Sequence, residues 1–214
     1  MSALIENADP LLRALGLTLV ILVVSGVGSL LLGVLVTVAR VSPIPVLRGA
    51  AFCYVQVFVN VPLLALLLLA VFALPDAGLI MPLTTTVIVV LVVYEAAYVA
   101  EAVRSGINTV SPGQVEAARA LGLTLGRTLR HVVVPQALRA VVQPLGNVLI
   151  ALLMNTALAA TVGVVELTSA VNKVNLVEAR PIPIFAGAGL VYMALALAIG
   201  LTAGRIERRV AIRR

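Results

Sequence analysis

Long apolar runs separated by short polar stretches organise this chain. A helix that crosses a lipid bilayer needs about 20 mostly apolar residues. Five segments of the chain meet that requirement: residues 14–39, 50–74, 82–103, 137–163 and 183–204. The turn-forming stretch 75–78 separates the second segment from the third, and the proline-containing stretch 179–183 opens the fifth. The pattern predicts an all-α membrane protein with five transmembrane helices, forming a single domain over residues 1–214.

Composition supports the same class. Hydrophobic residues make up 62% of the 214-residue chain and charged residues only 11%, whereas a soluble domain carries roughly 25% charged residues. The single cysteine, Cys53, excludes an internal disulfide. The chain is therefore expected to be an integral membrane protein that contacts the lipid bilayer.

The basic residues predict the orientation of the spans. Arg13, Lys173 and Arg180 fall on one side of the five predicted spans. The other twelve fall on the opposite side: Arg40, Arg48, Arg104, Arg119, Arg127, Arg130, Arg139, Arg205, Arg208, Arg209, Arg213 and Arg214. Because positive residues collect on the cytoplasmic side, we expect the N-terminus outside and the C-terminus in the cytoplasm. The net charge of +6 then indicates contact with anionic lipid, and no nucleic acid partner.

A polar loop over residues 104–135 is long for a simple connection. A turn at 111–113 is expected to precede a short helix that begins with Glu116 in its first turn and is broken at Gly122. Its small apolar face would be formed by Ala117, Ala118 and Leu121. The residues alone leave two interpretations open. The helix either seats in a cleft of a cytoplasmic partner or lies on the membrane surface as an amphipathic loop helix.

The spacing within this loop resembles the signature of permease subunits of ABC importers. The signature runs Glu116-Ala117-Ala118, three residues, Gly122, nine residues, Val132, one residue, and Val134-Pro135. The flanking stretch Tyr98–Ile107 is similar to the polar amino acid branch of that family. Three further stretches resemble actinobacterial glutamate-type permeases: Arg40–Pro43, Ser105–Val110 and Pro144–Asn147.

The resemblance implies a type I ABC importer permease fold and ATP-driven import of an amino acid, of glutamate or glutamine type, with a basic amino acid as a further possibility. It also implies a coupling helix that docks on a separate ATPase, carried here by Glu116, Ala117, Ala118, Gly122 and Pro135. The implied partners are a second permease subunit, two ATPase subunits and an extracellular or periplasmic solute-binding protein.

The chain itself is not expected to be an enzyme. Its only lysine, Lys173, follows Asn172, so no Gly-Lys-Ser/Thr phosphate loop exists in the sequence. We expect no cofactor in this chain, with ATP and Mg²⁺ bound by the ATPase. His131 and Cys53 are each single, and neither predicts a metal site or a catalytic nucleophile.

Polar residues inside the predicted spans are the candidates for a substrate pathway, because an ionisable group at membrane depth is costly to insert. They are Asn60, Pro62, Tyr94, Glu95, Tyr98, Asn155 and Thr156. Pro62 frees a backbone carbonyl within the second segment and predicts a broken helix there, which is tolerated where it lines a cavity. Two interpretations other than a substrate pathway remain open. In one, Glu95 is protonated and hydrogen-bonded within the helix bundle. In the other, the amides and hydroxyls only hold helices together. Glu101 lies three residues before Arg104, so these two are expected to form an ion pair.

Two positions depart from the amino acid branch. That branch commonly has an Arg-x-Thr-Pro motif where this chain has Val59 to Pro62, and a lysine where it has Met154. We therefore hypothesise that Glu95 meets the ammonium group or a cationic side chain of the substrate, while a different second permease meets the carboxylate. This hypothesis favours a heterodimer over a homodimer. The rival function is a secondary transporter that works without nucleotide and uses Glu95 for proton coupling.

The loop from Glu166 to Pro181 lies on the predicted outer side and carries charges of both signs. In an importer this loop would face the solute-binding protein. A plain solvated loop explains the same residues equally well.

Overall fold

Helices form nearly all of the computed structural model, which describes residues 6–210. The α-helices are α2 (Ala8–Val41), α3 (Pro45–Asn60), α4 (Leu63–Phe72), α5 (Leu83–Asn108), α6 (Pro112–Ala120), α7 (Leu125–Thr128), α8 (Val134–Thr156), α9 (Leu167–Glu178) and α10 (Pro181–Val210). A π-helical turn, η1 (Leu129–Val133), joins α7 to α8, and a 3₁₀ helix, η2 (Ala157–Val162), follows α8. The predicted all-α class is confirmed. The tail residues Arg213 and Arg214, which we assigned to the cytoplasmic side, lie outside the described residues.

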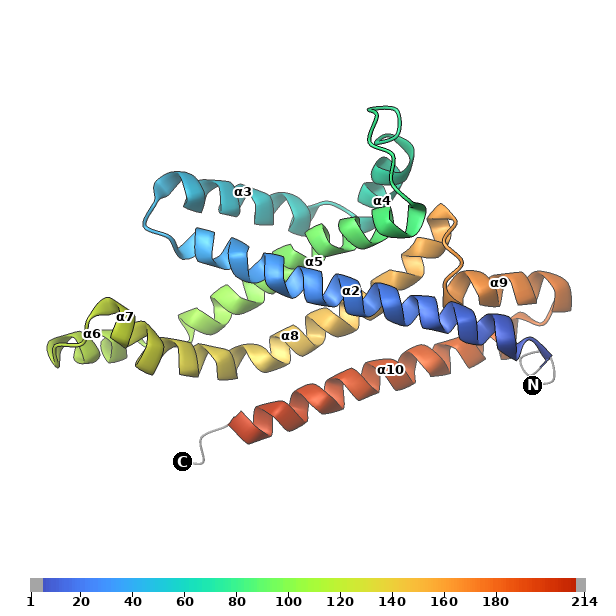
Figure 1. Ribbon diagram of the computed structural model, residues 1–214. Helices are drawn as coiled ribbons and strands as arrows, with labels where there is room; N and C mark the ends of the chain where they lie inside the picture. The colour runs from blue at the N-terminus through green and yellow to red at the C-terminus, as the bar shows by residue number, and fades with distance from the viewer. Residues whose placement is uncertain (1–5, 211–214) are drawn as a thin grey trace.

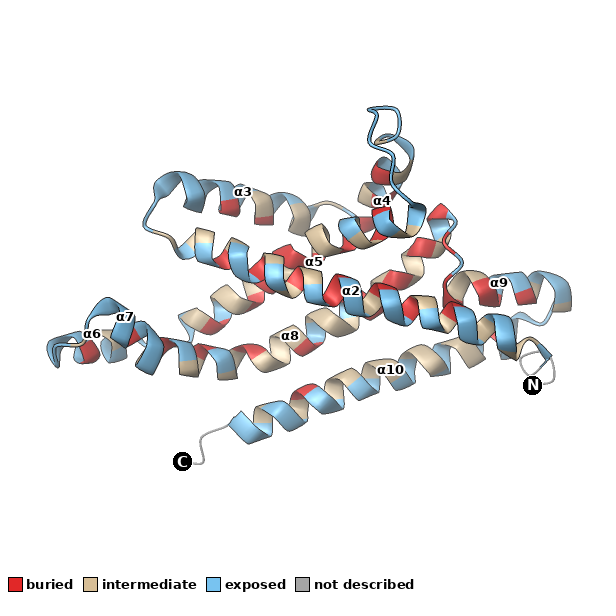
Figure 2. Ribbon diagram, viewed as in Figure 1, coloured by how far each residue is buried: buried red, intermediate tan, exposed pale blue. Residues whose placement is uncertain are grey.

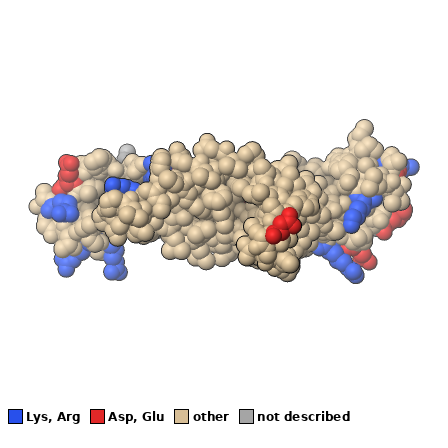
Figure 3. Space-filling view, turned by 90° about the horizontal axis from the view of Figure 1, so that it is seen from above, with Lys and Arg blue, Asp and Glu red and all other residues tan. Residues whose placement is uncertain are grey.

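The molecule is elongated, with its long helices running between two ends (Figure 1). The N-terminal end of α2 lies with α9 at one end, whereas α6 and α7 lie at the other end, toward which α10 runs (Figure 1). Charged side chains gather at the two ends, and the long middle is nearly free of them on the face seen in Figure 3. This distribution suits a protein whose middle crosses the apolar layer of a membrane.

Among the described residues, four helical stretches are long and apolar enough to cross a membrane: Ala8–Val41, Leu83–Asn108, Leu125–Val162 and Pro181–Val210. The remaining predicted span, the second at 50–74, corresponds to the helix pair α3 and α4, which is bent by 99° at its break. Counting that pair as one span gives the five that the sequence predicts. The chain is a multi-pass membrane protein.

Pro62 explains the break between α3 and α4. Proline has no backbone N–H to donate, and its ring disfavours a helical conformation for the residue before it. Val61 is accordingly extended, with φ −103° and ψ 136°, and α4 begins directly after Pro62. The sequence identified the position of this break, but the size of the bend depends on the packing of α4 against α5 and η2.

Helix α5 lies at the centre of the bundle, with α2, α3, α4 and α8 packed on it. Its close contact with α2 depends on Gly33, where an added Cβ would lie 2.5 Å from side-chain atoms of Val99. Small residues allow helices to approach in this way inside membranes. By contrast, most of α10 is exposed or only partly covered (Figure 2). Its apolar surface is suited to lipid or to another protein.

Two local expectations were wrong. Helix α6 begins at Pro112 rather than after a turn, so Glu116 is its fifth residue and is not in the first turn. Proline suits the first position of a helix, where its missing N–H has no partner to lose. The stretch after Glu166, which was expected to be a loop, is the helix α9. Glu166 itself is 0% exposed, so this residue is not part of a plain solvated loop.

Candidate pathway and coupling surface

Gly122 ends helix α6 through a closed hydrogen-bonding pattern. The N–H of Leu123 donates to the carbonyl of Ala118 at 3.2 Å, and the N–H of Gly122 donates to the carbonyl of Arg119 at 2.9 Å. These two bonds satisfy carbonyls that the end of a helix leaves without partners, and they require a left-handed residue between them. Gly122 supplies it with φ +83°. The glycine of the sequence signature is therefore needed to end α6 and turn the chain toward α7.

Helix α6 presents one side to its own chain and the other outward. Ala118 is buried against the following segment, whereas Glu116 and Ala117 are exposed. The side chain of Gln136, near the start of α8, donates to Oε1 of Gln114 at 2.7 Å and so links α6 to the base of that span. Pro135 is the second residue of α8, directly after the π-helical turn. A force applied to the exposed side of α6 would thus reach α8 through short connections.

Glu101 holds an ion-paired cluster near the same end of the molecule. Its Oε2 accepts hydrogen bonds from Arg104 at 2.7 and 3.1 Å, which confirms the ion pair predicted within this helix. Its Oε1 pairs with Arg40 of α2, a partner that the sequence did not reveal. The guanidinium carbon of Arg40 also lies 5.5 Å from the centre of the Phe52 ring in α3, within cation–π range. Three helices therefore meet at this cluster.

A polar cavity of about 340 Å³ lies between α5 and α8. It is lined by Tyr94, Glu95, Tyr98, Asn147, Val148, Ala151 and Asn155. Glu95 is only 1% exposed, and its Oε1 accepts a hydrogen bond from Nδ2 of Asn155 at 2.7 Å. The hydroxyls of Tyr94 and Tyr98 lie 3.1 Å apart. The structure thus brings four of the predicted pathway residues into one site.

The other three predicted pathway residues lie outside the lining of this cavity. Asn60 is exposed, and its side chain donates to the carbonyl of Gln56 at 2.8 Å, at the end of α3. Pro62 is also exposed and lies in the break between α3 and α4. A hydrogen bond of 3.4 Å from Tyr98 to the carbonyl of Val59 places this break next to the cavity. Thr156 is fully buried and donates to the carbonyl of Leu153 at 2.6 Å.

Asn147 is a lining residue that was not among the predicted pathway residues. It lies eight residues before Asn155 on the same helix, and at about 3.6 residues per turn this spacing is just over two turns, so the two amides lie on one side of α8. The spacing from Asn155 was the signal in the sequence that could have identified Asn147 as a lining residue. The cavity wall contributed by α8 is therefore amphipathic, with the small residue Ala151 between the two amides.

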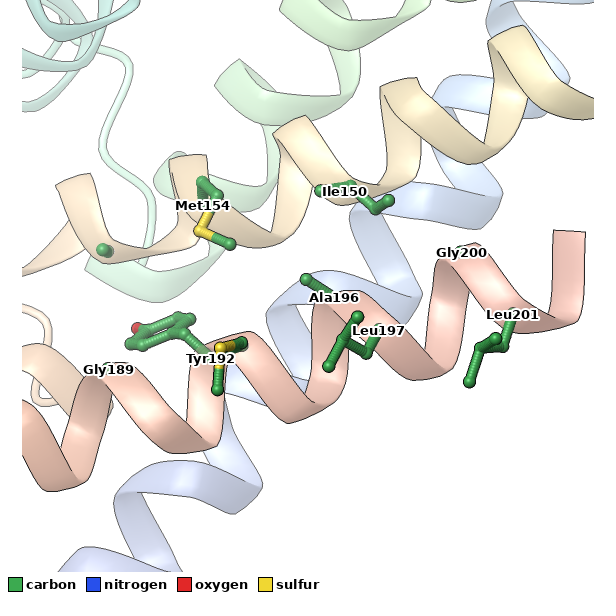
Figure 4. Close-up of a pocket in the computed structure, with 10 residues that line it drawn as sticks. Ile150, Met154, Gly189, Tyr192, Ala196, Leu197, Gly200 and Leu201 are labelled. Atoms are coloured by element: carbon green, nitrogen blue, oxygen red, sulfur yellow. The ribbon is translucent and has the colours of Figure 1, made fainter. Parts of the chain in front are cut away.

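A larger cavity of about 680 Å³ lies between α8 and α10. Figure 4 shows Met154 on α8 opposite Tyr192 on α10, with glycines and aliphatic side chains around them. Among its lining residues, the Tyr192 hydroxyl is the only polar side-chain group. This cavity lacks groups to meet the charged ends of an amino acid, so the smaller α5–α8 cavity is the better candidate for a polar substrate.

Comparison with known proteins places these features in a family. Residues 29–212 match the family described as binding-protein-dependent transport system inner membrane component. The chain is 35% identical over 232 residues to the glutamate transport system permease protein GluC of Corynebacterium glutamicum, covering 100% of both chains. It is 32% identical to the probable glutamine ABC transporter permease protein GlnM of Bacillus subtilis, covering 98% of this chain and 97% of the relative.

A solved structure gives the same result. The crystal structure of an amino acid ABC transporter with histidines superposes with a TM-score of 0.90 at 30% identity, covering 96% of each chain. The fold is thus that of type I ABC importer permeases. The chain belongs to the family of binding-protein-dependent transport system inner membrane components, as a permease subunit of an amino acid ABC importer of the glutamate and glutamine type.

Proposed function

We propose that this chain forms half of the translocation pathway of an ATP-driven amino acid importer and couples it to a separate ATPase through α6. The observation that carries the proposal is the arrangement of α6, which exposes Glu116 and Ala117 while Ala118 packs inward. Gly122 and Pro135 fix the two ends of the connection to α8. ATP and Mg²⁺ would be bound by the ATPase, and this chain would supply no catalytic group.

The proposed orientation puts α6 in the cytoplasm and α9 on the outer side. Support comes from the basic residues, which collect on the side of α6 as the positive-inside rule expects. With α3 and α4 counted as one span, an odd number of crossings supports termini on opposite sides, and the basic residues favour the N-terminus outside and the C-terminus in the cytoplasm. Helix α9 is then available to a solute-binding protein. In a pair of permeases, the two α6 helices with their exposed Glu116 side chains would face two ATPase subunits.

The proposed substrate pathway follows α5 and α8. It is lined by Tyr94, Glu95, Tyr98 and Asn155, with Asn60 and Pro62 at the neighbouring helix break and Thr156 buried at the end of α8. A broken helix with free backbone groups is tolerated in a membrane where it lines a cavity. Because a single chain encloses the pathway from one side only, a second permease completes it, and a heterodimer is favoured.

The rival function is transport by this chain without nucleotide, with Glu95 carrying a proton. Glu95 is buried beside a cavity, as such a role requires. That function gives no reason for an exposed α6 with its glycine-dependent end. The ATP-driven importer uses both features, and we therefore favour it.

The test is uptake of labelled glutamine, glutamate and arginine into proteoliposomes that contain this chain, its second permease and its ATPase, with the binding protein added outside. We expect uptake that requires ATP inside and stops when the ATPase subunits are left out. Proteoliposomes with this chain alone serve as the control. Uptake by the chain alone without ATP would contradict the proposal and support the rival.

A further inference from the structure

We propose that the cavity between α5 and α8 binds the substrate's ammonium group at Glu95 and accepts amino acids whose net charge is zero or positive. The inference rests on the proposed function, because it assumes that the substrate passes this subunit. It concerns the substrate class at one site, whereas the proposed function concerns the source of energy for transport.

Glu95 has unused capacity to accept hydrogen bonds. A carboxylate has about four acceptor positions on its two oxygens. Among the described residues, Asn155 is its only hydrogen-bond partner, at 2.7 Å from Oε1. The three N–H donors of an ammonium group match the remaining positions. Asn155 orients the carboxylate from the α8 side, so the group is held in place before the substrate arrives.

The cavity contains no cation that would neutralise Glu95. Its described lining residues include no lysine, arginine or histidine. Arg40 and Arg104, which lie near the inner end of the same bundle, are both engaged by Glu101. A buried carboxylate without a positive partner is costly at membrane depth. A cationic group of the substrate would remove that cost when it binds.

The remaining polar groups suit the other end of a zwitterion. The side-chain amide of Asn147 forms no hydrogen bond among the described residues, and it faces a cavity that also holds the hydroxyls of Tyr94 and Tyr98. The N–H groups of the Asn147 amide are able to donate to a substrate carboxylate, whereas the Tyr98 hydroxyl already donates to the carbonyl of Val59. The volume of about 340 Å³ lies at the lower end of the range of roughly 300–1,000 Å³ found for small-ligand sites.

Charge then separates the candidate substrates. Glutamine keeps one ammonium and one carboxylate, and arginine adds a second cation. Glutamate adds a second carboxylate, which would lie in the same cavity as Glu95 with no cation to compensate it. Like charges placed together in a low-dielectric site are strongly unfavourable. The cavity should therefore select against glutamate, although one relative is named as a glutamate permease.

The experiment measures binding directly. Labelled glutamine, arginine and glutamate are equilibrated with the complete permease–ATPase complex in nanodiscs, without the binding protein, whose own affinity would otherwise hide that of the cavity. We expect glutamate to bind at least about tenfold more weakly than glutamine or arginine. In a heterodimer, the second permease is not changed by the substitutions in this chain. Binding to the second permease therefore serves as an internal reference.

Glu95→Gln keeps the size of the side chain and removes its charge. We expect this variant to bind glutamine and arginine at least about tenfold more weakly, because a charged hydrogen bond is lost, and to discriminate less against glutamate. Glu207→Gln is the matched control. It removes a carboxylate that pairs with Gln143 of α8 through a 2.7 Å hydrogen bond, away from the cavity. Its binding should match that of the wild type.

A second variant tests the same inference with Glu95 intact. Asn147→Lys places a cation in the cavity, and it should weaken arginine binding and strengthen glutamate binding. Unchanged binding in both variants, or tighter binding of glutamate than of glutamine by the wild type, would overturn the inference. ATP-driven uptake measured in the same preparations keeps the two proposals apart. If uptake needs ATP while Glu95→Gln binds normally, only the inference about the cavity fails.

Discussion

The hydroxyl of Tyr192 in α10 donates a 2.8 Å hydrogen bond to Oε2 of Glu166, the residue that caps α9. The other carboxylate oxygen accepts from the backbone N–H of Ser169 at 2.9 Å. Thr18 of α2 lies 3.4 Å from the same carboxylate and accepts from the N–H of Leu167 at 3.0 Å. One fully buried carboxylate thus joins α9 to two spans at the proposed outer side of the protein.

Glu166→Ala should destabilise the protein because it leaves the backbone N–H of Ser169 without its partner and removes the acceptor of the Tyr192 hydroxyl. We expect a loss of about 2 kcal/mol or more in the free energy of unfolding. Chemical denaturation of the purified complex measures this loss of stability. Glu178→Ala, at the other end of α9, is the control and should change stability by less than about 0.5 kcal/mol. Equal effects of the two substitutions would refute a special role for the buried carboxylate.

Gly33 and Gly16 lie on the same helix, α2, but differ in their surroundings. A Cβ on Gly33 would meet Val99 at 2.5 Å and the carbonyl oxygen of Ala96 at 2.9 Å, whereas nothing lies within 4 Å of one on Gly16. Gly33→Ala should therefore cost about 1–3 kcal/mol through overpacking. Gly16→Ala should be neutral or slightly stabilising, because alanine is the better helix former. Thermal unfolding of both variants measures the difference, and similar melting curves would contradict the close packing of α2 on α5.

Arg40 and Arg48 provide a matched pair at the proposed cytoplasmic end. Arg40 pairs with Glu101 and packs over Phe52, while Arg48 is exposed near the start of α3. Arg40→Ala should reduce stability by about 1–3 kcal/mol, because a partly buried charge pair loses one partner. Arg48→Ala should have an effect of less than about 0.5 kcal/mol. Denaturation of each variant complex tests this, and a larger effect of Arg48→Ala would contradict the account.

Gly122→Ala tests whether the end of α6 depends on a left-handed residue. At φ +83° an alanine is strained by about 1 kcal/mol. The exposed position makes overall unfolding a weak measure of this effect. We expect less ATP-driven uptake for each ATP hydrolysed, because the strain displaces α6 relative to α8. Gly126→Ala in α7, with φ in the ordinary range and open space around it, should leave that ratio unchanged.

Apolar pattern and proline positions predicted the spans and the break at Pro62, because these depend on local sequence. The signature spacing likewise identified Gly122. The start of α6 differs from the predicted turn at 111–113 because Pro112, although it opposes the interior of a helix, is favoured at its first position. Burial of Glu166 was missed because its partners, Thr18 and Tyr192, lie on other helices. The Arg40–Glu101 pair and the 99° bend likewise depend on contacts between segments distant in sequence.

The central claim is that α6 couples this permease to a separate ATPase. Its most direct test measures uptake and ATP hydrolysis together in proteoliposomes of the assembled importer carrying Glu116→Lys, with Asp76→Lys in the exposed turn after α4 as the charge-reversal control. We predict that Glu116→Lys lowers ATP-driven uptake by about tenfold or more, because a reversed charge at a docking surface is strongly unfavourable, while Asp76→Lys transports normally. Normal coupled uptake by Glu116→Lys, or uptake that needs no ATPase subunit, would contradict the account.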